Sequence, residues 1–181
     1  TAGSYANGTY SRGHMCPNGS RNGTTTMQAQ TFYVTNQDPQ NQDSVNSGLG
    51  SNLEGAVQGV AKGNGNEEIY VVTGVAFNKE GESRTISYTS PRDASSQQVP
   101  IPNYFYKLVL RVKTSGATVT DAVCVAFWFE HKTYSDSYAN YTVSVDEVES
   151  WTGFDFFVNL PSEIEARCEA KNTSWEAFKS F

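Results

Sequence analysis

Residues 36–60 read NQDPQNQDSVNSGLGSNLEGAVQGV, and this stretch contains a clear helical pattern in its second half. We predict a helix from about Asn46 to Lys62-Gly63, where glycine favours a stop. The polar run from Asn36 to Asp43 contains Pro39 and is predicted to be a loop. The apolar residues at helical spacing are Leu49, Leu53, Ala56, Val57 and Val60.

The rest of the chain alternates apolar runs with turn-rich segments. β-branched and aromatic runs predict strands at 31–35, 68–77, 104–112 and 122–129. Ser144 followed by Glu147 resembles a capping box and predicts a helix start, and a second short helix is predicted over 162–170. Residues 1–30, rich in Gly, Asn, Ser and Thr, are predicted to be mostly loop. The sum is an α+β fold, with a mostly antiparallel sheet and flanking helices, in a single domain over 1–181.

Composition limits the possible functions. The 181 residues carry a net charge of −6, which opposes approach to a polyanion unless basic groups or a cation gather at the site. No run approaches the ~18 apolar residues of a membrane helix, so no membrane partner is expected. Charged residues make up only 18%, and the Asn, Gln, Ser and Thr bias suggests a secreted or periplasmic protein.

Three cysteines, Cys16, Cys124 and Cys168, are too widely spaced for a zinc site. Cys124 lies in an apolar run and is expected in the core. A Cys124–Cys168 disulfide is possible from sequence and is left open, and the odd number leaves at least one thiol without a partner in this chain.

The chain has two histidines in different settings. His14 stands in Ser11-Arg12-Gly13-His14-Met15-Cys16-Pro17, where glycine and proline indicate a shaped loop and hence a candidate functional residue. His131 follows an apolar run and is interpreted as a surface or hydrogen-bonded core residue. On the predicted helix, the amide oxygen of Asn46 could bind a hard cation, and Glu54 follows eight residues later.

Order and spacing together give a more specific signal than any one of these residues. Arg12-Gly13-His14, Asn36-Gln37-Asp38-Pro39-Gln40, Asn46 and Leu53-Glu54 together resemble the DNA/RNA non-specific endonucleases of the ββα-metal superfamily. The resemblance extends over nearly the whole chain, through Val72-Thr73-Gly74 and three later blocks. Those blocks lie at 102–107, 143–149 and 152–157.

The chain also departs from the family pattern. Ser11 stands in place of the usual Asp, and Gly50 in place of a frequent Trp. Family members usually have strands before the first motif, where this chain has only ten residues. We therefore expect either a shortened member or a protein completed by an upstream N-terminal segment or a second chain.

The resemblance implies a metal-dependent, sugar-non-specific endonuclease that hydrolyses DNA and RNA to 5′-phosphate products, with little sequence preference. His14 would be the general base, and Asn46 would hold Mg²⁺ or another divalent cation such as Mn²⁺. Glu54 would position a metal-bound water, and Arg12 and Arg21 would contact phosphate.

Three alternatives remain at this point. The chain could be a catalytically inactive nuclease fold that only binds, for example at a cell surface, or it could cleave a different phosphodiester with the same metal site. It could also be a β-rich carbohydrate-binding domain that uses Trp128, Trp151 and Trp175 as stacking platforms. Trp128 and Trp151 are expected in the core and Trp175 near the surface, which argues against the last alternative.

Overall fold

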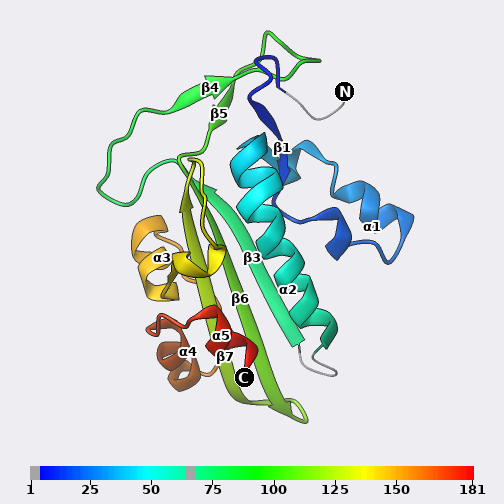
Figure 1. The fold of residues 1–181 in the computed structure, drawn as a ribbon. Coiled ribbons are helices and arrows are strands. Elements are labelled where there is room, and N and C mark those ends of the chain that lie inside the picture. Colours follow the sequence, from blue (N-terminus) through cyan, green and yellow to red (C-terminus); the bar gives the residue numbers. More distant parts are fainter. Residues whose placement is uncertain (1–4, 64–67) are drawn as a thin grey trace.

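A four-stranded antiparallel sheet forms the centre of the protein (Figure 1). The computed structural model describes residues 5–63 and 68–181. The sheet order is β3-β6-β7-β8, and the strands predicted at 68–77, 104–112 and 122–129 are confirmed. The strands are β3 (Glu68–Ala76), β6 (Tyr104–Ser115), β7 (Thr118–Glu130) and β8 (Thr142–Val143).

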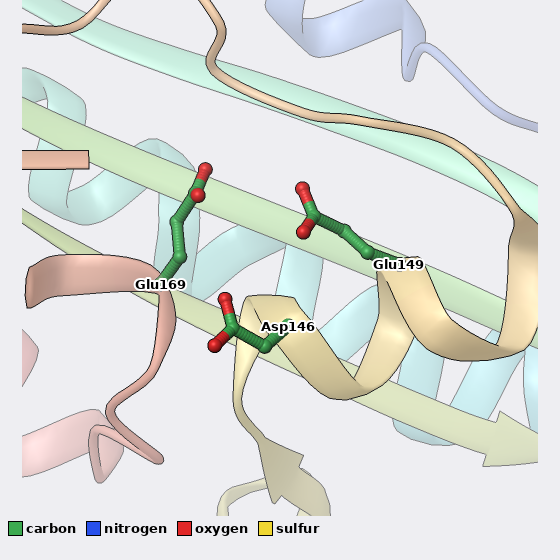
Figure 2. Close-up of side chains that lie close together, drawn as sticks. All are labelled: Asp146, Glu149 and Glu169. Atoms are coloured by element: carbon green, nitrogen blue, oxygen red, sulfur yellow. The ribbon is translucent and has the colours of Figure 1, made fainter. Parts of the chain in front are cut away.

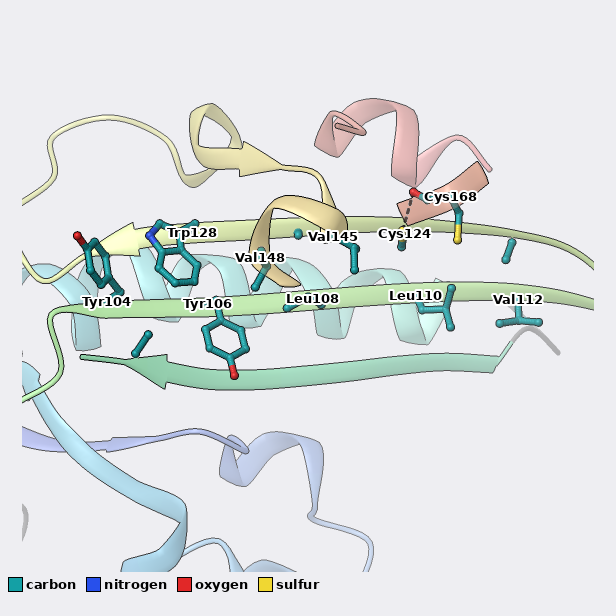
Figure 3. Close-up of a cluster of buried hydrophobic side chains, with 13 residues drawn as sticks. Tyr104, Tyr106, Leu108, Leu110, Val112, Cys124, Trp128, Val145, Val148 and Cys168 are labelled. Carbon is teal, nitrogen blue, oxygen red and sulfur yellow. Dashed lines mark hydrogen bonds between the residues drawn. The ribbon is translucent and has the colours of Figure 1, made fainter. Parts of the chain in front are cut away.

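Alternation along β6 gives the sheet two apolar faces, because successive side chains of a strand point to opposite sides. On one face, Tyr106 and Leu110 belong to a first hydrophobic cluster, which also contains Val148 from a helix that covers this face (Figure 3). Phe105 and Val109 belong to a second cluster on the opposite face. The sheet is therefore buried on both sides.

Different helices cover the two faces. Helices α3 (Val145–Thr152) and α4 (Ser162–Glu169) contribute Val145, Val148 and Cys168 to the first cluster. Helix α2 (Ser51–Gly63) contributes Leu53 and Val57 to the second, together with Trp175 and Phe178 of α5 (Trp175–Lys179). Trp175 is only 4% exposed, so the expectation that it lies near the surface is wrong.

The predicted helix start at Ser144 is confirmed in atomic detail. The Ser144 hydroxyl accepts a hydrogen bond from the Glu147 N–H, and the Glu147 carboxylate accepts from the Ser144 N–H, which is a complete capping box. Gly153 ends α3 in a left-handed conformation, with φ of 72°. The helix predicted over 162–170 is also confirmed, as α4.

The N-terminal part differs most from the sequence predictions. The region expected to be loop contains β1 (Tyr10–His14), α1 (Thr25–Gln30) and a 3-10 turn at Asn18–Ser20; its residues 1–4 lie outside the described part. The polar segment predicted to be loop forms β2 (Gln37–Asn41), which pairs with β1. Pro39 is tolerated there because the sheet has only two strands, and proline needs no ladder donor at an edge.

The strand predicted at 31–35 is absent from this described segment, which instead closes α1. The backbone N–H groups of Thr31, Phe32 and Tyr33 donate to the last carbonyls of α1, and a 3-10 turn follows at Val34–Asn36. Capping of the helix end overrides the β-propensity of these residues.

Three smaller elements complete the chain. Strands β4 (Ser87–Thr89) and β5 (Val99–Ile101) form a separate antiparallel pair, and a 3-10 turn covers Tyr138–Tyr141.

The three cysteines form no disulfide, so the Cys124–Cys168 bridge that the sequence left open is absent. Instead, the buried Cys124 thiol donates a hydrogen bond to the Cys168 carbonyl oxygen at 2.9 Å. Within the described ranges, no helix is long and apolar enough to span a bilayer.

Candidate active site

Two short strands and a helix carry most of the predicted site residues. Strands β1 and β2 pair in antiparallel register, with His14 opposite Gln37 and Gly13 opposite Asp38. The chain then enters a helical rod that is π-helical over Gln42–Gly50 and continues as α2. His14 ends β1, and Asn46 lies in the π-helical segment. The arrangement is a ββα unit packed on the α2 face of the sheet.

His14 is half-buried, and its Nε2 atom is buried without a hydrogen-bond partner among the described residues. The Phe32 ring lies edge-on to the imidazole, with 5.4 Å between ring centroids. Burial lowers the pKa of His14 below the usual 6.5, so the ring is neutral near pH 7. A neutral imidazole with an unused ring nitrogen can accept a proton.

Asn46 is oriented by two hydrogen bonds. Its Nδ2 donates to the Ser11 hydroxyl at 3.1 Å and to the Gln42 side-chain oxygen at 3.2 Å. Both amide hydrogens are therefore used, and no hydrogen bond from the described part of the chain reaches the Asn46 Oδ1. Since Mg²⁺ and similar cations take oxygen ligands, this unused acceptor suits a metal. The bond to Ser11 also ties the helical rod to the strand that carries His14.

The half-buried Glu54 and the buried Lys107 lie beside His14. All three line a small cavity of about 40 Å³, large enough for a water molecule. Burial raises the pKa of Glu54, and the Lys107 ammonium partly offsets this effect. Lys107 is 7% exposed; burial lowers its pKa, while the charges of Glu54 and Cys16 oppose that shift.

Lys107 is a residue of this site that sequence reasoning did not single out. Its ammonium donates to the Thr73 hydroxyl at 2.6 Å, and it lies in β6 between the buried Tyr106 and Leu108. A lysine between large hydrophobic residues of a predicted central strand is the signal that could have found it, because a buried ammonium needs partners. Glu54, Thr73 and Lys107 also line a larger adjoining pocket of about 460 Å³, with Cys16 and Gln58.

The two arginines are not gathered at His14. The Arg12 guanidinium contacts both carboxylate oxygens of Asp93 at 3.1 Å. Arg21 follows the 3-10 turn at Asn18–Ser20, is exposed, and donates to the Gln30 side chain at 3.3 Å. The structure therefore brings His14 and Glu54 to one cavity and links Asn46 to β1, while both arginines are bonded elsewhere.

Asn36 fixes the loop that follows His14. Its side-chain oxygen accepts from the Cys16 N–H, and its amide donates to the carbonyl oxygens of Cys16 and Thr31, all at 2.9 Å. One side chain thus satisfies three backbone groups and holds β1 to the end of α1. This is a physical role for the first residue of the Asn36-Gln37-Asp38-Pro39-Gln40 motif.

His131 has a structural role, in agreement with the interpretation from sequence. Its Nε2 accepts the Asn41 N–H at 2.9 Å, so the proton lies on Nδ1, which donates to the Pro102 carbonyl oxygen at 2.8 Å. Both ring nitrogens are satisfied, and the ring joins the end of β2 to the segment before β6.

Comparison with known proteins identifies the family. A profile of the DNA/RNA non-specific endonucleases matches residues 1–163. A nuclease from Nostoc sp. is 29% identical over 172 residues, which is 92% of this chain and 57% of the relative. The mitochondrial nuclease EXOG of Mus musculus is 26% identical over 184 residues, 98% of this chain and 48% of the relative. Nuclease C1 of Cunninghamella echinulata is 28% identical over 163 residues, with 88% and 62% covered.

Among solved structures, EndoG in its complex with the inhibitor EndoGI matches with a TM-score of 0.69 and 21% identity, covering 86% of this chain and 62% of EndoG. The fold is thus that of the ββα-metal nucleases. The chain belongs to the DNA/RNA non-specific endonuclease family. It spans about half the length of several curated relatives that it matches.

Proposed function

We propose that this chain acts as a metal-dependent, sugar-non-specific endonuclease that hydrolyses phosphodiester bonds of DNA and RNA to 5′-phosphate products. Family membership supports this reaction, and the unpartnered Nε2 of the neutral His14 carries the proposal. A buried polar atom without a partner costs free energy, and a catalytic role is one recognised reason why a folded protein retains such an atom.

In the proposed reaction, His14 removes a proton from a water molecule aligned with the scissile phosphate. The water oxygen bonds to phosphorus, and the bond from phosphorus to the 3′-oxygen breaks. The leaving 3′-oxygen takes a proton from a second water molecule, which leaves a 5′-phosphate and a 3′-hydroxyl. Glu54, beside the same cavity as His14, holds water in place through hydrogen bonds. The Lys107 ammonium favours the ionised form of Glu54 and so opposes the effect of burial on its pKa.

Asn46 is the proposed metal ligand, through the Oδ1 that its two donor bonds leave available. We propose Mg²⁺, or another divalent cation such as Mn²⁺, which when bound would stabilise the negative charge that develops on the phosphate. A single protein ligand implies weak, exchangeable binding in the free protein.

Arg21 and Arg12 are the proposed phosphate contacts. Arg21 is exposed and held only by a long bond to Gln30, whereas Arg12 would have to exchange Asp93 for phosphate. Contacts to phosphate alone carry no base information, so we expect little sequence preference. Export to the periplasm or the medium, suggested by composition, remains a proposal.

The test is a gel assay of supercoiled plasmid and total RNA with Mg²⁺ or with excess chelator. We expect cleavage of both substrates with Mg²⁺, none with chelator, and a loss of at least ~10²-fold in the His14→Ala variant. Its thermal melt should match the wild type. Cleavage by His14→Ala at the wild-type rate would refute the assignment of His14 as the general base. A folded wild-type chain that binds DNA without cleaving it would favour the inactive binding protein.

A further inference from the structure

A second acidic cluster lies on the face of the sheet opposite the ββα unit. Asp146 and Glu149, one turn apart on α3, approach Glu169 at the end of α4. One ligand oxygen from each lies within 4.8 Å of the others (Figure 2). Because α3 and α4 cover one face and α2 the other, this cluster is separate from His14 and Asn46.

Glu169 is the unusual member of the cluster. It is 5% exposed, and its Oε1 is buried without a hydrogen-bond partner. Buried carboxylates are normally paired, yet Glu169 points toward two further acids. It also ends α4, where the helix dipole disfavours negative charge.

The surroundings offer these carboxylates little compensation. Burial, the largest cause, together with the neighbouring charges of Glu149, Cys168, Glu165 and Asp146, raises the pKa of Glu169 to about 8. The basic side chain of α4, Arg167, pairs with Asp121 instead. The arrangement leaves a concentration of negative charge that either protons or a cation must neutralise.

We propose that Asp146, Glu149 and Glu169 form a second divalent-cation site that takes Ca²⁺. Three carboxylates supply the hard oxygen ligands that this ion prefers, and water can complete its six to eight positions. Glu149 is already oriented, because its Oε1 accepts the Phe156 N–H at 2.7 Å and its other oxygen remains for the ion.

Coordination number and flexibility select the ion. Ca²⁺ takes six to eight oxygen ligands in flexible geometry at roughly 2.3–2.6 Å, whereas Mg²⁺ demands a near-ideal octahedron at about 2.0–2.1 Å. Three carboxylate oxygens that lie within 4.8 Å of one another on two separate helices can surround one Ca²⁺ without having to form a regular octahedron. The bound ion would join the last turn of α4 to the first turns of α3, and so stabilise the fold without contacting the nuclease site.

The test measures thermal melting and calorimetric binding of CaCl₂ with the full chain. Asn46→Ala is included to remove the proposed nuclease metal. At about one hundred times the dissociation constant, Ca²⁺ should raise the melting temperature of wild type and of Asn46→Ala by roughly 5 °C or more. Mg²⁺ should have a smaller effect on Asn46→Ala at the same concentration.

Glu169→Gln should lose the Ca²⁺ response. Without cation at neutral pH it should melt higher than wild type, because glutamine is neutral in both states and folding then requires no proton uptake at this position. Asp146→Asn, at an exposed position, tests the same site without disturbing the core. Glu163→Gln, exposed on the same helix, is the matched control and should keep the response. If Ca²⁺ leaves wild type unchanged, or stabilises Asp146→Asn and Glu169→Gln equally well, the cluster is neutralised by protons and the proposal fails.

Discussion

At the residue scale, His14 owes its proposed reactivity to its environment. Burial under Phe32 removes water from the imidazole and disfavours the charged form, while no partner from the described residues occupies Nε2. His131 is also buried and its pKa is also lowered, but both of its ring nitrogens are bonded. The difference between the two histidines lies in hydrogen bonding, which sequence does not show.

We predict that the acid limb of nuclease activity has its midpoint below about pH 6.5, because a lowered His14 pKa keeps the neutral base at lower pH. Phe32→Ala exposes the ring, so the pKa of His14 should rise toward 6.5 and the acid limb should move with it. Proton NMR titration of the two imidazoles measures this directly, with His131 as the internal reference. An unchanged His14 pKa in Phe32→Ala would contradict the role of burial.

Asp38 gives a second pH prediction, this time for stability. Burial raises its pKa from 3.8 to about 7, although Gln40 donates to both of its oxygens and opposes the shift. The folded state therefore binds more protons than the unfolded state between about pH 4 and 7, so the Asp38 contribution to stability falls as pH rises through this window.

Asp38→Asn should accordingly raise the free energy of unfolding at pH 8 by at least ~1 kcal/mol, or roughly 2–4 °C, with little gain near pH 4. Thermal melts at the two pH values provide the measurement. The control is Asp43→Asn, an exposed position two residues after β2, which should show no gain that grows with pH. A gain for Asp38→Asn that is equal at both pH values would argue against an ionised buried carboxyl.

At the element scale, the π-helical segment that carries Asn46 depends on Gly50. A Cβ at this position would lie 2.4 Å from the Val45 carbonyl oxygen, which is backbone and cannot rotate away. Glycine avoids this clash, so the local backbone requires a residue without a side chain at this position. The wide turn over Gln42–Gly50 also sets the position of Asn46.

Gly50→Ala should therefore destabilise the protein by roughly 1–3 kcal/mol and raise the Mg²⁺ concentration needed for half-maximal activity. Gly55→Ala, on the same rod with open space around the added methyl group, should be neutral or stabilising by up to ~1 kcal/mol. Melting curves and Mg²⁺ titrations of the two variants test this. Equal behaviour of both variants would mean that the π-helical segment adapts freely.

The helices and strands that could be predicted from the sequence are those whose pattern of apolar residues matches the side chains that are buried in the structure. The strands β3, β6 and β7 and the helices α2, α3 and α4 carry long apolar runs or caps, and sequence found them. The β1–β2 pair escaped prediction because Tyr10–His14 and Gln37–Asn41 lack apolar alternation. Their pairing depends on long-range contacts, such as the Asn41 bond to His131, that no local pattern contains.

The candidate site was predictable only through motif order. His14, Asn46 and Glu54 come from segments that sequence placed in a loop and a helix, and family resemblance linked them. The assignments of their roles stay predictions. Lys107 escaped attention because the groups that act on it lie far away in sequence. Thr73, 34 residues before it, is on the neighbouring strand β3, and Glu54, 53 residues before it, is on helix α2.

At the scale of the whole molecule, the approach of a nucleic acid depends more on how charge is distributed than on the net charge of −6. The segment from 145 to 169, which contains α3 and α4, holds seven acidic residues and one basic residue. The described segment 5–63, which carries the ββα unit, holds three of each. The excess negative charge therefore lies on the face away from the proposed site, where it repels a nucleic acid least and where a cation can neutralise it.

This asymmetry leads to a prediction about salt. A protein that contacts duplex phosphate through about two arginines should bind DNA with a slope of log affinity against log salt near −2, since each contact contributes about −0.9. Arg21→Ala should reduce the slope by about 1, whereas Lys171→Ala, just beyond α4, should leave it unchanged. Fluorescence anisotropy of labelled DNA with the His14→Ala protein at fixed Mg²⁺ measures binding without cleavage. If Arg21→Ala leaves the slope unchanged, the phosphate contacts come from other residues. If the parent protein itself has a slope near zero, it holds its substrate through the metal rather than through charge on its surface.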